Sequence, residues 1–236
     1  MASPGGLTPR SNIDFRLRMD SQLRGRLLEI VGKAAVDASG SVVSPADPVQ
    51  VAAVCALCTE TSTRMAVTSS AATAPDASRG DVLTVALHRM TGIAVDPGSL
   101  TARAEAGALV SALRSAVDAG GLALAVPAAA GATHAGSLVA RGGIARRGLC
   151  GIEVVLPGGE QVHAGGRMPK DVAGYDLCGA LLGSRGRLGL VVAATFRLVP
   201  AGARLIAHEA PGVTSPGSSG ELIRAAFDPG RLLLEA

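Results

Sequence analysis

Hydrophobic and polar positions follow a helical period in some parts of the chain and an alternating period in others. A partly periodic apolar face predicts a helix over Ser21–Ala38, and two valines predict a short strand at Val42–Val43. Asp47 is placed to cap a helix over Pro48–Glu60, which has proline at its first position. Met65–Thr68 is the next expected strand. The first part of the chain is therefore predicted to form a strand-helix-strand unit.

The remainder of the chain favours short strands separated by turn residues. Pro97-Gly98 and Pro157-Gly158-Gly159 mark two expected hairpins, and Gly120-Gly121 marks a helix end. The expected elements are strands at Val82–Leu87, Ile93–Asp96, Leu100–Ala106, Cys150–Leu156 and Gln161–Ala164, a helix at Gly107–Ala119, and a buried strand ending at Pro200.

Composition points to a globular protein and excludes several classes. Of 236 residues, 48% are hydrophobic, and the 22 basic and 19 acidic side chains are dispersed. The chain therefore lacks the clusters of basic residues that are typical of nucleic-acid binding. With Trp 0, Tyr 1 and Phe 3, it also has few aromatic rings for base stacking. We find no apolar run long enough to span a membrane and no signal-peptide pattern, which predicts a cytoplasmic protein.

The four cysteines do not form a recognisable metal or disulfide framework. Cys55 and Cys58 share one face of an expected helix, and no second pair or nearby histidine completes a four-ligand set. We interpret them as small core residues in a reducing compartment, and we expect no metal site.

The run from Gly165 to Pro200 carries the most specific pattern in the chain. Its ordered elements are Lys170, Gly174-Tyr175-Asp176-Leu177, Gly183-Ser184, Gly186 and Leu188-Gly189-Leu190, followed by Thr195, Arg197 and Pro200. This order resembles the C-terminal half of an FAD-binding domain of the PCMH (vanillyl-alcohol oxidase) type, in particular that of the glycolate oxidase FAD-binding subunits.

The resemblance implies a fold and a division of the chain. The fold class is α+β, a two-lobed PCMH-type FAD-binding fold with mixed sheets flanked by helices. The implied parts are an N-terminal helical segment (1–40), the FAD-binding domain (41–200, with lobes at about 41–90 and 91–200), a linker in place of the substrate domain (201–220), and a C-terminal helix and turn (221–236).

The loop expected to bind the FAD pyrophosphate departs from the family pattern. Where the family carries Arg-Gly-Gly-Gly-Thr, this chain has Ser69, Ser70, Ala71, Ala72 and Thr73. Alanine in a left-handed conformation costs about 1–2 kcal/mol, whereas the hydroxyls could donate hydrogen bonds directly. A degraded loop and an adapted loop both follow from these residues.

A second expected contact region begins at Pro127 and resembles the segment that leads a short helix onto the flavin. Thr133 or His134 takes the family's threonine position, Gly136 keeps one glycine, and Ser137 or Ala135 replaces the other. After Ala140 the chain is several residues shorter than the family. The resemblance further implies that Gly186 contributes to cofactor binding and that Leu188–Val191, with Leu190 and Val191 among the binding residues, offer backbone groups to the adenine.

Other polar residues of these regions have two interpretations each. His134 is either a catalytic or flavin-attaching residue or a structural one, and His88, His163 and His208 give no further signal. Lys170, Asp171 and Tyr175 are expected to hold a turn, and Arg141, Arg146 and Arg147 either face phosphate or form a solvated loop. The sequence identifies no catalytic residue.

Two functions are compatible with this pattern. The first is an FAD-binding component of a glycolate-oxidase-like 2-hydroxy-acid oxidoreductase that acts with partner oxidoreductase subunits. The second is a pseudoenzyme with the flavoprotein scaffold but weak or no FAD binding, which serves as an interaction or structural subunit.

Overall fold

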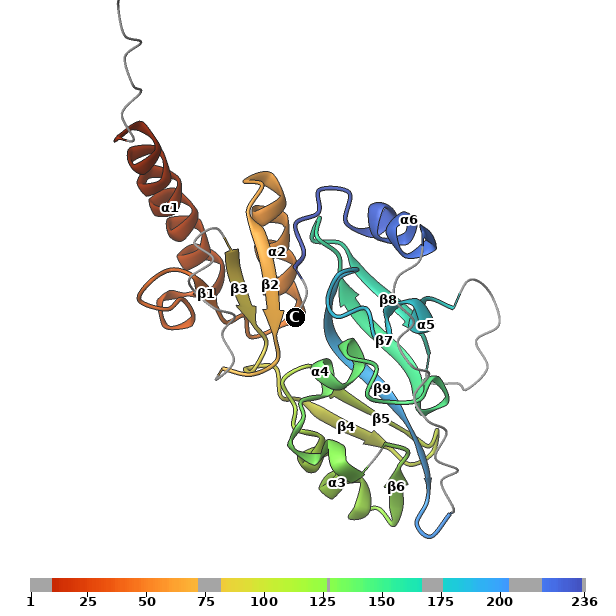
Figure 1. Ribbon diagram of the computed structural model, residues 1–236. Coiled ribbons are helices and arrows are strands. Elements are labelled where there is room, and N and C mark those ends of the chain that lie inside the picture. The colour runs from red at the N-terminus through yellow and green to blue at the C-terminus, as the bar shows by residue number, and fades with distance from the viewer. Residues whose placement is uncertain (1–9, 72–81, 127, 167–175, 204–217, 235–236) are drawn as a thin grey trace, which may run out of the picture.

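The chain folds around two sheets of different type (Figure 1). The computed structural model describes residues 10–71, 82–126, 128–166, 176–203 and 218–234. The first sheet has the order β1-β3-β2, with β1 (Val42–Val43), β2 (Arg64–Thr68) and β3 (Val82–Ala86) all parallel. The helix α2 (Pro48–Glu60) connects β1 to β2.

The second sheet is antiparallel and has the order β4-β5-β9-β7-β8. Its strands are β4 (Ile93–Asp96), β5 (Thr101–Glu105), β7 (Leu149–Val155), β8 (Gln161–Gly165) and the long β9 (Leu190–Pro200), and β6 (Leu122–Leu124) pairs with the far end of β9. One parallel and one antiparallel sheet, each with helices, confirm the predicted α+β class.

The start of α2 follows the sequence prediction. Asp47 accepts a hydrogen bond from the Gln50 N–H at 2.8 Å, and Pro48 occupies the first helical position, where its missing N–H costs nothing. Cys55 and Cys58 lie on the buried face of this helix with no exposed surface. Burial raises the pKa of both thiols, that of Cys58 to about 12, so they stay protonated as core residues.

Two predicted helices have different ends in the structure. The predicted helix Ser21–Ala38 is wrong at both ends, since α1 spans Arg10–Val31, stops where Gly32 takes a φ of 80°, and is followed by a separate turn, η1 (Lys33–Ala35). The predicted helix Gly107–Ala119 begins later, as α3 (Val110–Asp118).

The remaining helices are short and follow the second half of the chain. They are η2 (Ala128–Ala132), α4 (Ala135–Ala140), η3 (Arg146–Gly148), α5 (Leu177–Leu181) and α6 (Ser218–Phe227). Within the described parts of the chain, no helix combines the length and the apolar character that crossing a bilayer requires.

The C-terminal segment returns to the first sheet. Leu234 donates its N–H to the Met65 carbonyl at 2.8 Å, and Met65 donates to the Leu232 carbonyl at 2.7 Å, so this segment runs along the free edge of β2. The fully buried Asp228 carboxylate accepts the N–H groups of Leu232 and Leu233, both at 2.9 Å. A single buried carboxylate thus holds the turn that brings the last residues to the sheet edge.

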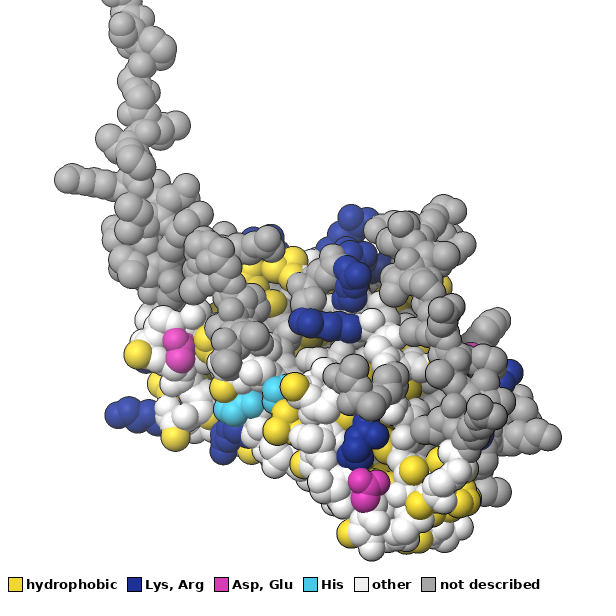
Figure 2. Space-filling view, turned by 60° about the horizontal axis from the view of Figure 1, so that its bottom comes forward, with side chains coloured by type: hydrophobic (Ala, Val, Ile, Leu, Met, Phe, Trp, Pro, Cys, Tyr) yellow, Lys and Arg dark blue, Asp and Glu magenta, His cyan; other side chains and the backbone are white. Residues whose placement is uncertain are grey.

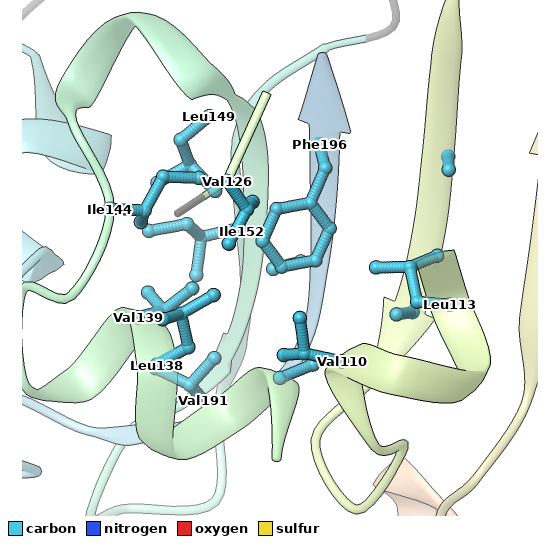
Figure 3. Close-up of a cluster of buried hydrophobic side chains, with 14 of the residues drawn as sticks. Val110, Leu113, Val126, Leu138, Val139, Ile144, Leu149, Ile152, Val191 and Phe196 are labelled. Carbon is cyan, nitrogen blue, oxygen red and sulfur yellow. The ribbon is translucent and has the colours of Figure 1, made fainter. Parts of the chain in front are cut away.

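Two hydrophobic clusters fill the interior. The larger lies between one face of the second sheet and the helices α3 and α4, where Phe196, Ile152, Val139 and Val110 converge (Figure 3). The smaller cluster packs α1 and α2 on the first sheet, and the second sheet contributes to it through residues such as Leu190. Because both sheets bury side chains in this second cluster, the two sheets pack against each other where they meet.

Candidate functional site

The candidate site begins where the parallel strands of the first sheet end. Thr68 is paired with Ala86 at the carboxyl ends of β2 and β3, and the Leu87 N–H donates to the Thr68 carbonyl at 2.8 Å. Ser69 and His88 therefore leave the sheet at the same edge. In open α/β sheets, this carboxyl edge is where ligands bind.

The start of α4 packs directly on this edge. Ser69 is only 5% exposed, and a Cβ built on Gly136 would lie 2.8 Å from its Oγ and 2.8 Å from the Ala106 Cβ. No real Cβ atom tolerates such contacts, so only glycine permits this approach. Two of the regions that the sequence analysis assigned to the cofactor, the Ser69 loop and the Gly136 helix, are in contact.

The segment between β5 and α3 holds the two sides of the site together. The Ala106 and Ala108 carbonyls accept the N–H groups of Gly136 and Ala135, at 3.0 and 2.8 Å. On its other side, Gly107 donates to the Met90 carbonyl at 2.8 Å and lies against the backbone of His88. The turn after β3 and the start of α4 thus flank one turn, Ala106–Ala108.

His88 and His134 lie on either side of this segment. Burial lowers the pKa of His134 below its usual value, and the charge of His88 lowers it further. Nδ1 of His88 is buried and has no hydrogen-bond partner in the described part of the chain. Histidine side chains form a contiguous surface next to hydrophobic ones on the face shown in Figure 2.

The backbone amides at this edge are largely committed to the protein itself. The N–H groups of Ala135 and Gly136 bind the carbonyls described above, and that of Ser70 contacts the Thr68 Oγ1 at 3.2 Å. His134 precedes α4 as its N-cap without a side-chain capping bond. Among the described residues, these three amides are thus engaged within the protein, and imidazole and hydroxyl groups lie beside them.

This donor set fits the phosphate part of FAD. An unpartnered buried imidazole nitrogen needs either a hydrogen-bond acceptor or a donor, depending on its tautomer, and phosphate oxygens are strong acceptors. Ser69, His88 and His134 are the residues of the described chain that would face such a group.

The opposite end of α4 is closed by the turn that precedes β9. The Gly183 and Arg185 N–H groups donate to the Val139 and Ala140 carbonyls at 3.0 and 2.7 Å. Gly183, Arg185 and Gly186 all have positive φ angles, 78°, 53° and 79°, which bend the chain around the helix end. This places Gly186 beside α4, at the end away from Ser69.

Leu190 and Val191, which the resemblance assigned to the adenine, are strand residues. They pair with Val155 and Val154 of β7, and both side chains are buried, Leu190 fully. Their contribution to cofactor binding stays a prediction.

The other predicted residues have varied places. Arg146 binds Asp176 at 2.7 Å and the Leu149 carbonyl at 2.7 Å, which fixes the start of α5 against β7. Arg141 is exposed at the end of α4. Thr133 is half-buried, and its carbonyl accepts the Val110 N–H at 2.9 Å, while Ser137 lies in the first turn of α4. Ala72, Thr73, Pro127, Lys170, Asp171, Tyr175 and His208 lie outside the described residues.

Sequence reasoning missed His88. The sequence signal was that His88 follows the strand β3, which is parallel to β2, the strand that precedes the Ser69 loop. Two parallel neighbours release their next residues at one edge, so His88 could have been placed beside Ser69 from the strand order alone.

Comparison with known proteins gives three consistent results. A family model described as an FAD binding domain matches residues 40–165. Glycolate oxidase subunit GlcD of Bacillus subtilis is 33% identical over 131 residues, 51% of this chain and 28% of that protein. The mitochondrial D-lactate dehydrogenase [cytochrome] of Arabidopsis thaliana is 43% identical over 63 residues, 27% of this chain and 11% of that protein.

A solved structure agrees in fold. The structure of p-cresol methylhydroxylase with substrate bound superimposes with a TM-score of 0.62 at 17% identity, covering 84% of this chain and 45% of that one. The chain thus spans less than half of that structure and about a quarter of the glycolate oxidase subunit.

Proposed function

Because this chain belongs to the FAD binding domain family, we propose that it is the FAD-binding component of a 2-hydroxy-acid oxidoreductase of the glycolate oxidase kind. The membership confirms the resemblance inferred from the sequence, and with it FAD as the cofactor of the fold. When bound, FAD supplies the redox chemistry by accepting a hydride from a substrate, while the protein supplies binding and orientation.

The observation that carries the proposal is the contact between Ser69 and Gly136. It brings the loop after β2 and the start of α4 together at the carboxyl edge of the parallel sheet. The choice of a 2-hydroxy acid rests on the relatives, whose names include a glycolate oxidase subunit and D-lactate dehydrogenases. Since one such relative is named as a subunit, we also propose partner oxidoreductase subunits.

The proposal assigns defined tasks to the chain's own residues. Gly136 allows close approach of the loop, Ser69 offers a hydroxyl, and the buried wall of Ala106 and Ala135 excludes water from one side of the site. The turn Gly183–Gly186 fixes the far end of α4 through backbone hydrogen bonds, and the Ala106 and Ala108 carbonyls hold its near end in the same way.

A reconstitution experiment tests this function. The purified chain is mixed with FAD, and we expect a bound flavin spectrum after gel filtration and a rise in unfolding temperature, because a ligand that binds only the folded state stabilises it. Addition of glycolate or D-lactate without oxygen is expected to bleach the flavin. Absence of both the bound flavin and the thermal shift would contradict the proposal.

A second candidate is an interaction subunit that retains the scaffold without a functional flavin. The observation in its favour is Ala71 at a glycine position, together with the internal use of the Ala135 and Gly136 amides. Under this alternative, the chain shows no flavin uptake but forms a stable complex with its partner subunits in gel filtration.

A further inference from the structure

We propose that His88 and His134 form a two-imidazole clamp on the FAD diphosphate, in place of the glycines that the family carries in the loop after β2. This inference rests on the proposed function and assigns the residues that would make the cofactor bind.

The first step of the argument is the shortage of donors. A diphosphate carries two negative charges and requires several convergent N–H or O–H groups. In the described wall, the Ala135 and Gly136 amides donate to backbone carbonyls, and the Ser70 amide contacts a threonine hydroxyl. Ala71 adds a Cβ that disfavours the left-handed backbone with which glycine loops turn their amides inward.

The second step is the position of the imidazoles. His88 follows β3 at the edge where Ser69 follows β2, and His134 lies two residues before Gly136, which contacts Ser69. Both rings therefore lie on the elements that surround the loop. The segment Glu105–Val110 fixes their separation, because it is hydrogen-bonded to the elements that carry each of them.

The third step is that the two imidazoles have hydrogen-bonding capacity and charge that the described residues do not balance. Nδ1 of His88 is buried without a partner among the described residues, which costs free energy in the absence of a ligand. The charge of His88 also disfavours the charged form of His134, whose pKa burial already lowers. A phosphate anion bound to both rings would relieve both penalties at once, since it accepts hydrogen bonds and attracts imidazolium charge.

The experiment compares ligands with and without a diphosphate. FAD, riboflavin, ADP and inorganic pyrophosphate are titrated by calorimetry into the wild-type chain and the variants His88→Gln, His134→Gln and the double variant. The matched control is His163→Gln on β8, an imidazole that is 68% exposed and lies 3.9 Å from Glu153. Each chain is first checked for its unfolding midpoint.

We expect each single variant to lose about tenfold to hundredfold in affinity for FAD and ADP, as for a lost hydrogen bond to a charged group. Riboflavin affinity should stay within about twofold and the control should match the wild type. The ring C–H signals of His88 and His134, assigned by their loss in each variant, should shift when ADP is added.

The outcomes separate this inference from the proposed function. If the wild type binds FAD and both histidine variants bind it equally well, or lose FAD and riboflavin to the same extent, the clamp is wrong and the proposed function stands. If no flavin binds but ADP and pyrophosphate bind in a histidine-dependent way, the clamp is supported and the proposed function is wrong. If neither a flavin nor a diphosphate binds, both are wrong.

Discussion

The two ends of α4 differ in whether their polar groups find hydrogen-bond partners within the protein. At its C-terminal end, the carbonyls of Val139 and Ala140 receive the amides of Gly183 and Arg185, so the protein satisfies its own backbone. At its N-terminal end, Ser69, His88 and His134 gather, and one buried imidazole nitrogen has no partner in the described chain. This difference is expected if one end is a structural joint and the other end, as we propose, binds the cofactor.

The largest effect is expected from the core beneath the helix. Leu138 is 4% exposed and packs in the larger cluster (Figure 3), so Leu138→Ala should lower the free energy of unfolding by about 2–5 kcal/mol. Denaturant titration measures this loss. Leu138→Met, which conserves volume, should cost less than about 1.5 kcal/mol. Equal losses in the two variants would show that the cavity is not the cause.

A glycine at each end gives the sharpest comparison. Gly136→Ala forces a Cβ against Ala106 and Ser69, and we expect a cost of about 1–3 kcal/mol in unfolding free energy. It should also lower FAD affinity at least about tenfold, because the loop after β2 is pushed away.

Gly183→Ala is the matched control for that variant. Its Cβ has room, since the nearest atom is the Gly142 Cα at 3.8 Å, but its φ of 78° costs about 1–2 kcal/mol in unfolding free energy. FAD affinity should be unchanged. Equal loss of FAD in both glycine variants would break the distinction between a joint and a ligand site.

A smaller effect is expected at the start of α5. Asp176 caps this helix through the Gly179 N–H at 3.0 Å and binds Arg146, so Asp176→Ala should cost about 1 kcal/mol at neutral pH. The Arg146 hydrogen bond holds the pKa of Asp176 below its usual value.

The sign of the pH dependence follows from that direction. A carboxylate with a lowered folded pKa stabilises the protein above its unfolded pKa of about 3.9, and this contribution is lost as the pH falls through the folded value. The difference in unfolding temperature between the wild type and Asp176→Ala should be full at pH 7 and shrink below about pH 4. The control Asp118→Ala, an exposed aspartate at the end of α3, should change little at either pH. A difference that persists at low pH would assign the effect to something other than the charge.

The smallest effect is expected from Arg141. It is exposed at the closed end of α4, so Arg141→Ala should change the unfolding free energy by less than about 0.5 kcal/mol and leave FAD affinity unchanged. A clear drop in FAD affinity, measured by fluorescence titration, would show that the arginine faces phosphate after all.

Local signals predicted most of the fold. The Asp47 cap, the Pro48 start and the hairpin at Pro97-Gly98 depend on residues within a few positions, and the structure reproduces all three. The end of α1 was missed because the apolar period continues past Gly32 while the backbone does not.

The site was less predictable because its contacts join distant parts of the chain. The resemblance named the Ser69 and Gly136 regions, but only the structure brings them together. The positions of His88 and His134 depend on hydrogen bonds that join the turn after β3, the turn after β5 and the start of α4. No local sequence pattern encodes these contacts. Asp228 lies in the predicted C-terminal turn, and only the structure shows that it is a fully buried carboxylate that accepts two backbone N–H groups.

The return of Leu232–Leu234 to the edge of β2 has a consequence for biosynthesis. The strands of the first sheet are translated long before Leu232–Leu234, so the edge of β2 stays unpaired until these residues leave the ribosome. Exposed strand edges invite pairing with other chains, and nascent chains are most vulnerable at this stage. The emergence of Leu232–Leu234 from the ribosome is thus the step that covers the edge of β2, and a chain released before Leu232 should aggregate.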